Sequence, residues 1–150
     1  MTLVEKQPAG TPRPTGSSDP KTVLLLDDDA STLLVLHAVL ERTEARVIEC
    51  EDESCTERWC NELQGIDVIV ADVILQRTNG PAVVKKVRPL QPQTRLLFIS
   101  GFSLPDLDRR GLLHDCDLSP GRAEFLQKPF TPDQFLGAVE RLMAGEPPPS

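Results

Sequence analysis

The sequence predicts a parallel α/β fold, in which one β-sheet carries helices on both of its faces. Short apolar segments alternate with stretches of helical spacing, which is the pattern of repeated strand-helix units. Three of these segments, VLLL, VIVA and LLFI, are apolar throughout, as is typical of strands covered on both faces. The 150 residues, 39% of them hydrophobic, suffice for one domain with a core.

The expected elements follow one another along the chain. Five strands are predicted, at residues 22–26, 46–50, 66–71, 95–100 and 124–127. A first helix is indicated by an apolar stripe at Leu33, Leu36, His37 and Leu40, with Asp29 and Ser31 as equal candidates for its N-cap. A later helix, marked by Val83, Val84 and Val87, should end before Pro89, because the residue before a proline disfavours helical geometry.

The last helix has the clearest start. Thr131-Pro132-Asp133-Gln134 is a capping box with proline at the first helical position. The buried face that follows should consist of Phe135, Leu136, Val139, Leu142 and Met143. The segment 104–123, in contrast, holds two prolines, two glycines and four aspartates, so we expect any helix there to be short or irregular.

Composition sets the limits of the domain. Half of the 14 prolines lie in the first 20 and the last four residues. We therefore expect a disordered Pro-rich tail at 1–20, a domain at 21–145 and a disordered tail at 146–150. No signal-peptide core and no run of ~20 apolar residues is present, so we expect a cytoplasmic protein without membrane contact. The net charge of −7 disfavours a nucleic-acid partner.

Three of the four cysteines, Cys50, Cys55 and Cys60, have an even five-residue spacing. The spacing suggests a metal site, but the close C-x-x-C pairs of structural zinc sites are missing and both histidines are distant. We therefore expect small, partly buried thiols rather than metal ligands or a disulfide framework.

Polar residues stand at the ends of four predicted strands. Asp27 and Asp28 follow the first, Asp72 the third, Ser100 ends the fourth, and Lys128 follows the fifth. Ligands of an open parallel sheet bind outside the carboxyl ends of its strands, so these side chains should converge on one site.

Such a set supports phosphoryl transfer to a carboxylate. Mg²⁺ prefers oxygen ligands, usually one or two carboxylates with waters and phosphate oxygens, and Asp27 and Asp28 beside Asp72 suit it. The metal would neutralise the phosphoryl charge, so that Asp72 could form an acyl phosphate. Lys128 would then pair with one phosphoryl oxygen, and the Ser100 hydroxyl would donate to another.

Four pieces of the sequence together resemble a receiver domain of bacterial two-component response regulators. They are LLLDDDA, ADVILQRTNG with a glycine eight residues after Asp72, FISG and FLQKPF, and they span about residues 21–144. The resemblance implies a flavodoxin-like, doubly wound (βα)5 fold with a parallel sheet in the order 2-1-3-4-5. The SGF and KPF patterns are also similar to receivers associated with hybrid histidine kinases.

The same resemblance implies a role for each acid. Asp72 would be the phosphoacceptor, supplied by a histidine kinase or a histidine phosphotransfer protein. Asp28 would bind Mg²⁺ directly and Asp27 mainly through water, with Asp72 and the backbone carbonyl of Ile74 as further ligands. Ser100 and Lys128 would bind the phosphoryl group.

The resemblance also implies how the signal leaves the site. Phe125 would be the switch aromatic, whose inward rotation reports phosphorylation to the face built from the fourth helix, fifth strand and fifth helix. A homodimer through that face is left open. No DNA-binding or catalytic domain follows residue 144. We therefore expect a stand-alone regulator that signals to a downstream protein target. We do not expect an enzyme, apart from self-catalysed phosphotransfer and slow autodephosphorylation.

Three departures from the family pattern and two apolar positions near the site stand out. Gln76 replaces a usual proline and Phe125 a usual tyrosine, and we expect neither to abolish phosphorylation. The irregular segment 104–123 replaces the usual fourth helix, which bears on the standard output surface. Ile74 and Phe102, at the positions that flank the route of the hydrolytic water, are both apolar, so we expect a comparatively long-lived acyl phosphate.

Two alternatives remain. LLLDDDAST also fits a haloacid-dehalogenase-like phosphatase, with Asp27 as nucleophile and Asp29 as general acid. Those enzymes usually carry another acidic pair after the lysine, whereas the acids that follow Lys128 are Asp133, Glu140 and Glu146. The second alternative, a phosphorylation-independent pseudo-receiver that only binds partners, is weakened because the acids, hydroxyl and lysine are all present.

Overall fold

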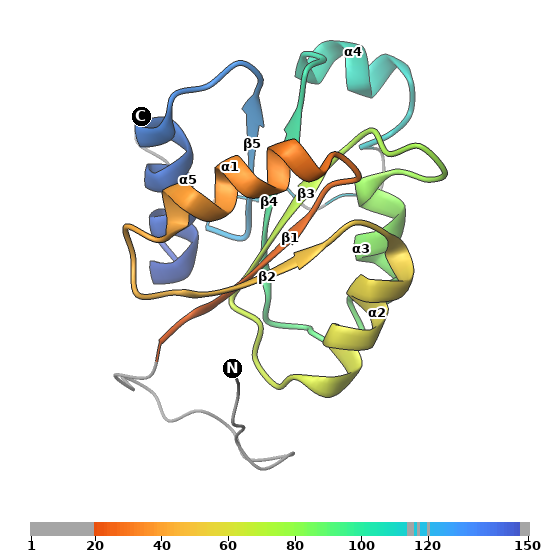
Figure 1. Cartoon of the computed structure of the whole chain (residues 1–150). Helices are drawn as coiled ribbons and strands as arrows, with labels where there is room; N and C mark the ends of the chain where they lie inside the picture. The colour runs from red at the N-terminus through yellow and green to blue at the C-terminus, as the bar shows by residue number, and fades with distance from the viewer. Residues whose placement is uncertain (1–19, 114–115, 117, 120, 148–150) are drawn as a thin grey trace.

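The computed structural model describes residues 20–113, 116, 118–119 and 121–147. The predicted tails lie almost wholly outside these residues. Five parallel strands form one sheet in the order β2-β1-β3-β4-β5, as the resemblance implied (Figure 1). The strands are β1 (Thr22–Leu26), β2 (Arg46–Cys50), β3 (Val68–Asp72), β4 (Arg95–Ser100) and β5 (Ala123–Gln127).

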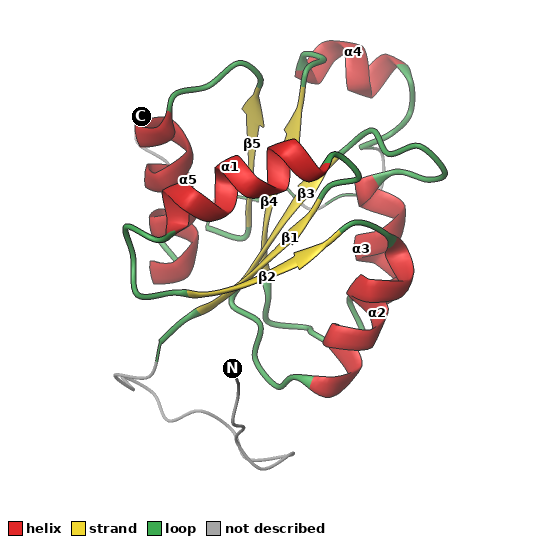
Figure 2. Cartoon of the chain, in the orientation of Figure 1, coloured by secondary structure: helices red, strands yellow, loops and turns green. Residues whose placement is uncertain are grey.

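A helix follows each strand. The helices are α1 (Ala30–Leu40), α2 (Glu53–Glu62), α3 (Gly80–Val87), α4 (Leu104–Arg109) and α5 (Pro132–Ala144). Figure 2 shows α1 and α5 on one face of the sheet and α2 and α3 on the other. None of the described helices has both the length and the apolar character needed to cross a membrane.

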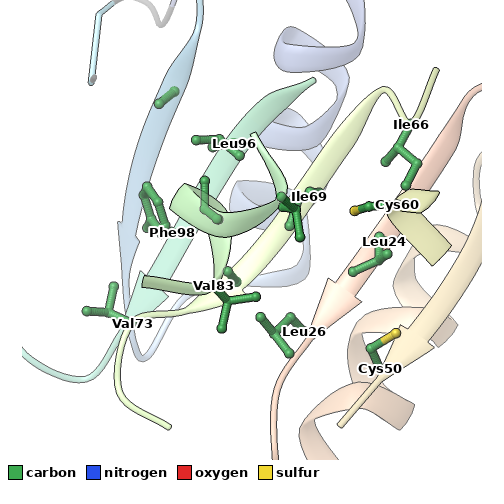
Figure 3. Packing of buried hydrophobic residues seen from close by; sticks show 14 of the residues in the cluster. Leu24, Leu26, Cys50, Cys60, Ile66, Ile69, Val73, Val83, Leu96 and Phe98 are labelled. Atoms are coloured by element: carbon green, nitrogen blue, oxygen red, sulfur yellow. The ribbon is translucent and has the colours of Figure 1, made fainter. Parts of the chain in front are cut away.

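Alternate residues of the central strands feed two separate cores. Val23 and Leu25 pack with α1 and α5, whereas Leu24 and Leu26 pack with α2 and α3. The second core is completed by residues such as Ile69, Val83 and Phe98 (Figure 3). Because both faces are covered, β1 and β3 are buried at every position, which explains why their residues are apolar apart from Thr22 and Asp72.

The helix starts agree with the sequence analysis. Asp29 is the N-cap of α1, where its side chain accepts hydrogen bonds from Ser31 N and Thr32 Oγ1. The capping box of α5 is present, with Pro132 in its first turn. The helix in the segment 104–123 is short, as expected, since α4 has only six residues.

Three predicted details differ. β3 begins at Val68, two residues later than expected, and extends one residue further so that Asp72 belongs to the strand. β5 begins one residue earlier, at Ala123. His37 is not buried with the leucines of its stripe but lies at the edge of α1, with Nδ1 2.5 Å from Glu49 Oε2.

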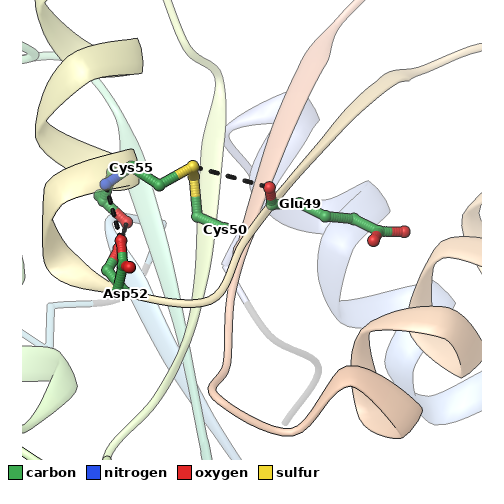
Figure 4. Close-up of a disulfide and its surroundings, with 5 residues drawn as sticks. Glu49, Cys50, Asp52 and Cys55 are labelled. Carbon is green, nitrogen blue, oxygen red and sulfur yellow. Dashed lines mark hydrogen bonds between the residues drawn. A yellow bond between two sulfur atoms is a disulfide. The ribbon is translucent and has the colours of Figure 1, made fainter.

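The expectation that all cysteines are thiols is wrong for one pair. Cys50 and Cys55 form a disulfide between the end of β2 and the first turn of α2 (Figure 4). The tight turn at Asp52, which caps α2, brings the two Cα atoms to 5.5 Å, within the range that a disulfide can bridge. Of the other two cysteines, Cys60 is buried and Cys116 half-buried, and neither belongs to a disulfide.

Candidate functional site

The site lies where the carboxyl ends of β1, β3, β4 and β5 meet. Asp27 directly follows β1, Asp72 ends β3, Ser100 ends β4, and Lys128 directly follows β5. Backbone hydrogen bonds hold the ends together. Asp27 N donates to Cys50 O at 3.1 Å, and Lys128 N donates to Ser100 O at 2.8 Å. The sheet register, rather than a flexible loop, therefore sets the position of these residues.

The ammonium group of Lys128 lies near the carboxylates of both Asp27 and Asp72. Lys128 Nζ lies 3.0 Å from Asp72 Oδ2 and 3.9 Å from Asp27 Oδ2. The Asp27 side chain is 2% exposed and that of Asp72 12%, whereas Lys128 is 33% exposed. The site thus combines two nearly buried acids with one cation that reaches them from the solvent side.

Burial raises the pKa of Asp27 from its usual 3.8 to about 6. The negative charge of Asp72 also raises the pKa, whereas the backbone N–H of Asp29 and the charge of Lys128 lower it. Protons and cations therefore compete for Asp27 near neutral pH.

One carboxylate oxygen of Asp27 lacks a hydrogen-bond donor and could bind a cation. Asp27 Oδ1 accepts the Asp29 N–H at 2.9 Å, but the buried Oδ2 has no hydrogen-bond partner. A buried carboxylate oxygen without a partner is costly, and a metal ion or a metal-bound water would remove that cost. This oxygen is the observation that makes the acidic site fit Mg²⁺.

The Asp28 carboxylate is bound by the loop that follows β3. Asp28 is half-buried, and its Oδ2 accepts the backbone N–H of Gln76 at 2.6 Å. Within the described part of the chain, no group of three or more His, Cys, Asp and Glu side chains is arranged to hold a metal. The three acids are therefore not a preassembled cage. One or two carboxylates with waters, the set that Mg²⁺ commonly accepts, remain sufficient.

The loop after β3 orients the predicted acceptor. Ile74 N donates to Asp72 Oδ1 at 3.0 Å, so the two Asp72 oxygens are divided between this N–H and Lys128. Gly80 N donates to Val73 O at 2.9 Å, which closes the loop at the start of α3.

Ser100 is buried at the end of β4, and its Oγ accepts the Phe102 N–H at 3.1 Å. Its own hydroxyl proton stays available for donation. The ring of Phe102 is 38% exposed and carries the Arg110 guanidinium at 4.3 Å from its centroid. Ile74 is also 38% exposed. Both apolar positions that the sequence analysis named therefore meet solvent.

Phe125 lies in the middle of β5, three residues before Lys128, and pairs with Phe98 of β4. It is half-buried and packs against the core on the α2 and α3 side. Its neighbour Glu124 forms a two-pronged ion pair with Arg141 of α5, at 2.9 and 3.1 Å. The aromatic predicted to switch thus belongs to a strand that is tied to α5 by charge.

The structure brings together Asp27, Asp72 and Lys128 with Ser100 on the adjacent strand end, and it leaves Asp28 held by Gln76. Sequence reasoning missed the Gln76 N–H and the Cys50 carbonyl. Both are backbone groups, and every residue except proline has the same backbone N–H and carbonyl, so the sequence gives no sign of these contacts. The one available signal was Gln76 itself, which stands where the family usually has a proline.

Comparisons with known proteins show the family and the fold of the chain. The sequence profile of the response regulator receiver domain matches residues 23–140. The DNA-binding transcriptional regulator NtrC of Azospirillum brasilense is 28% identical over 130 residues, which cover 86% of this chain and 25% of the regulator. The chain thus spans about a quarter of that relative.

Two solved structures share the fold. A response regulator receiver protein from Sinorhizobium medicae has 26% identity and a TM-score of 0.69, with 85% of this chain and 98% of that chain covered. The receiver domain from the hybrid histidine kinase CckA has 24% identity and a TM-score of 0.64, with 81% and 98% covered. The predicted similarity to receivers of hybrid kinases is therefore confirmed at the level of the fold.

Proposed function

Because the chain belongs to the response regulator receiver domain family, we propose that Asp72 accepts a phosphoryl group from a histidine kinase or histidine phosphotransfer protein in a Mg²⁺-dependent reaction. The contact between Lys128 Nζ and Asp72 Oδ2 is the observation that carries this proposal. It places a cation directly beside a nearly buried carboxylate, and this cation can move to the phosphoryl group.

The donor set for the metal is Asp27, Asp28, Asp72 and the backbone carbonyl of Ile74. A bound Mg²⁺ would neutralise charge on the incoming phosphoryl group. An oxygen of Asp72 attacks phosphorus while the bond to the phosphohistidine nitrogen breaks, and the electron pair of that bond returns to the imidazole. Lys128 then pairs with a phosphoryl oxygen, and the Ser100 hydroxyl donates to another.

Output is proposed to run through protein contacts. Phosphorylation would draw Ser100 and Lys128 toward the phosphoryl group, and Phe125 on β5 would turn further into the core. This changes the face formed by α4, β5 and α5, which a downstream protein or a second copy of the chain could contact. The stand-alone arrangement and the cytoplasmic location stay predictions, which the size and fractionation of the native gene product would test.

The two alternatives are less well supported. In a phosphatase, Asp29 would be the general acid, but both of its side-chain oxygens already accept hydrogen bonds at the start of α1. A pseudo-receiver would not need a buried Asp27 Oδ2 that lacks a hydrogen-bond donor.

The proposal is tested by incubation with Mg²⁺ and acetyl phosphate, followed by intact-mass analysis. We expect one covalent phosphate on the wild type and none on Asp72→Asn, with much slower labelling of Asp27→Asn. Asp133→Asn, which changes an exposed acid of α5, is the matched control and should label normally. Sustained hydrolysis of small phosphate esters that requires Asp27 would favour the phosphatase. A folded wild type that gains no phosphate would favour the pseudo-receiver.

A further inference from the structure

We propose that the backbone N–H of Gln76 is a positioning group that holds the Asp28 carboxylate away from the metal site, so that Mg²⁺ binds in competition with this hydrogen bond. The inference deepens the proposed function and rests on it. It concerns the strength of metal binding, which can be measured without any phosphorylation.

The contact is short and joins distant parts of the chain. Gln76 N donates to Asp28 Oδ2 at 2.6 Å across 48 sequence positions. A hydrogen bond to an ionised acceptor is about twice as strong as a neutral one. The Asp28 oxygen therefore already has a good partner, which a cation must displace.

The donor is fixed in place by its loop. Leu75 N donates to Thr78 O at 3.2 Å, and Ile74 and Asn79 form an antiparallel bridge. Asn79 in turn caps α3 through a hydrogen bond to Ala82 N at 2.8 Å. Because the loop is tied at both ends, Asp28 is the partner that must move when the hydrogen bond breaks.

The contacts of the three acids differ. Asp27 and Asp72 share Lys128, whose Nζ lies 3.9 and 3.0 Å from their Oδ2 atoms, whereas Asp28 Oδ2 accepts the Gln76 N–H. No three-acid cluster exists among the residues that the structure describes. Ligation of a metal ion by Asp28 Oδ2 therefore requires this oxygen to give up the Gln76 N–H.

Residue 76 controls this step through its backbone alone. Proline has no N–H, whereas every other residue presents one. Gln76→Pro should remove the competing donor, and Gln76→Ala should keep it while it removes the exposed side chain. These two variants separate the backbone contact from any role of the glutamine side chain.

The test is a Mg²⁺ titration of the unphosphorylated full chain by calorimetry, with amide NMR in parallel. We expect Gln76→Ala to bind like the wild type and Gln76→Pro to bind about 5-fold more tightly or better, as loss of one competing hydrogen bond implies. In the wild type, the Gln76 amide should lose its protection from hydrogen exchange as Mg²⁺ saturates the site. Asp28→Ala should produce the same loss without metal.

The outcomes distinguish this inference from the proposed function. Equal or weaker binding by Gln76→Pro than by Gln76→Ala, or an unchanged Gln76 amide on saturation, overturns the inference alone. If Gln76→Pro does not fold, the amide measurement on the wild type decides. No Mg²⁺ binding by any variant overturns both proposals, and Mg²⁺ binding without phosphorylation of Asp72 overturns only the proposed function.

Discussion

Lys128 Nζ lies 3.0 Å from Asp72 Oδ2, and this pair connects the end of β5 with the end of β3 across 56 sequence positions. We predict that Lys128→Met lowers the free energy of unfolding at pH 7 by about 1–3 kcal/mol, because two nearly buried carboxylates lose their cation. Urea denaturation measures the change. In Lys128→Met/Asp72→Asn most of the loss should disappear, and a loss that persists in the double variant would contradict the pairing.

The raised pKa of Asp27 makes stability depend on pH. Its pKa is about 6 in the folded chain and near 3.8 when unfolded, so between these values the folded state binds more protons. The free energy of unfolding should therefore fall as pH rises from about 4 to about 6 and then level off in this contribution.

We predict that Asp27→Asn removes this dependence and gains up to about 3 kcal/mol at pH 7, since one pKa unit corresponds to ~1.4 kcal/mol. Denaturation of the wild type, Asp27→Asn and the exposed control Asp133→Asn across pH 4–8 measures it. An Asp27→Asn profile that keeps the wild-type slope would show that another group titrates there.

Ile74 and Phe102 are exposed and apolar, so neither side chain can orient a hydrolytic water. We predict that Ile74→Asn combined with Phe102→Gln shortens the lifetime of phosphorylated Asp72 by about 10-fold, because one new hydrogen bond to the water stabilises the attack by ~1.4 kcal/mol. Decay of the phosphorylated mass measures the lifetime. Leu34→Asn, on the exposed side of α1, is the control. A half-life that is unchanged or longer would refute the prediction.

Gly80 is required by the close approach of the backbone after Asp72. A Cβ at this position would collide with the Asp72 carbonyl oxygen, whereas one at Gly101 would meet nothing within 4 Å. We predict that Gly80→Ala lowers the free energy of unfolding by about 1–3 kcal/mol and slows Asp72 phosphorylation. Thermal denaturation compares it with Gly101→Ala. Equal stability of the two variants would count against this role for Gly80.

The Cys50–Cys55 disulfide closes a short loop beside Asp27, whose N–H donates to the Cys50 carbonyl. We predict that a reductant lowers the free energy of unfolding by about 2 kcal/mol, as the entropy of such a loop implies. Cys55→Ser should have the reduced stability and no response to the reductant. A wild type that does not respond would mean that the bond contributes nothing.

The sequence by itself determined the five strands, the helices α1, α3 and α5, and most of the site. The apolar segments predicted the strand bounds within two residues, and the capping sequence predicted the start of α5. Asp27, Asp72, Ser100 and Lys128 could be placed together because parallel strands share a carboxyl edge, whatever their separation in sequence. The strand order itself came from the family resemblance and not from these patterns.

Only the tertiary structure decided the contacts that local periodicity does not encode. The buried Gln91 amide is one, since it donates to Cys60 O and Leu63 O and accepts from Ile66 N. The hydrogen bond from Gln76 N to Asp28 is another. Each contact joins segments that are far apart in the sequence, and it depends on how these segments approach one another in the fold. Asp27 Oδ2 lacks a partner for the same reason, because the packing that buries it is set by the whole sheet and not by the triplet of aspartates.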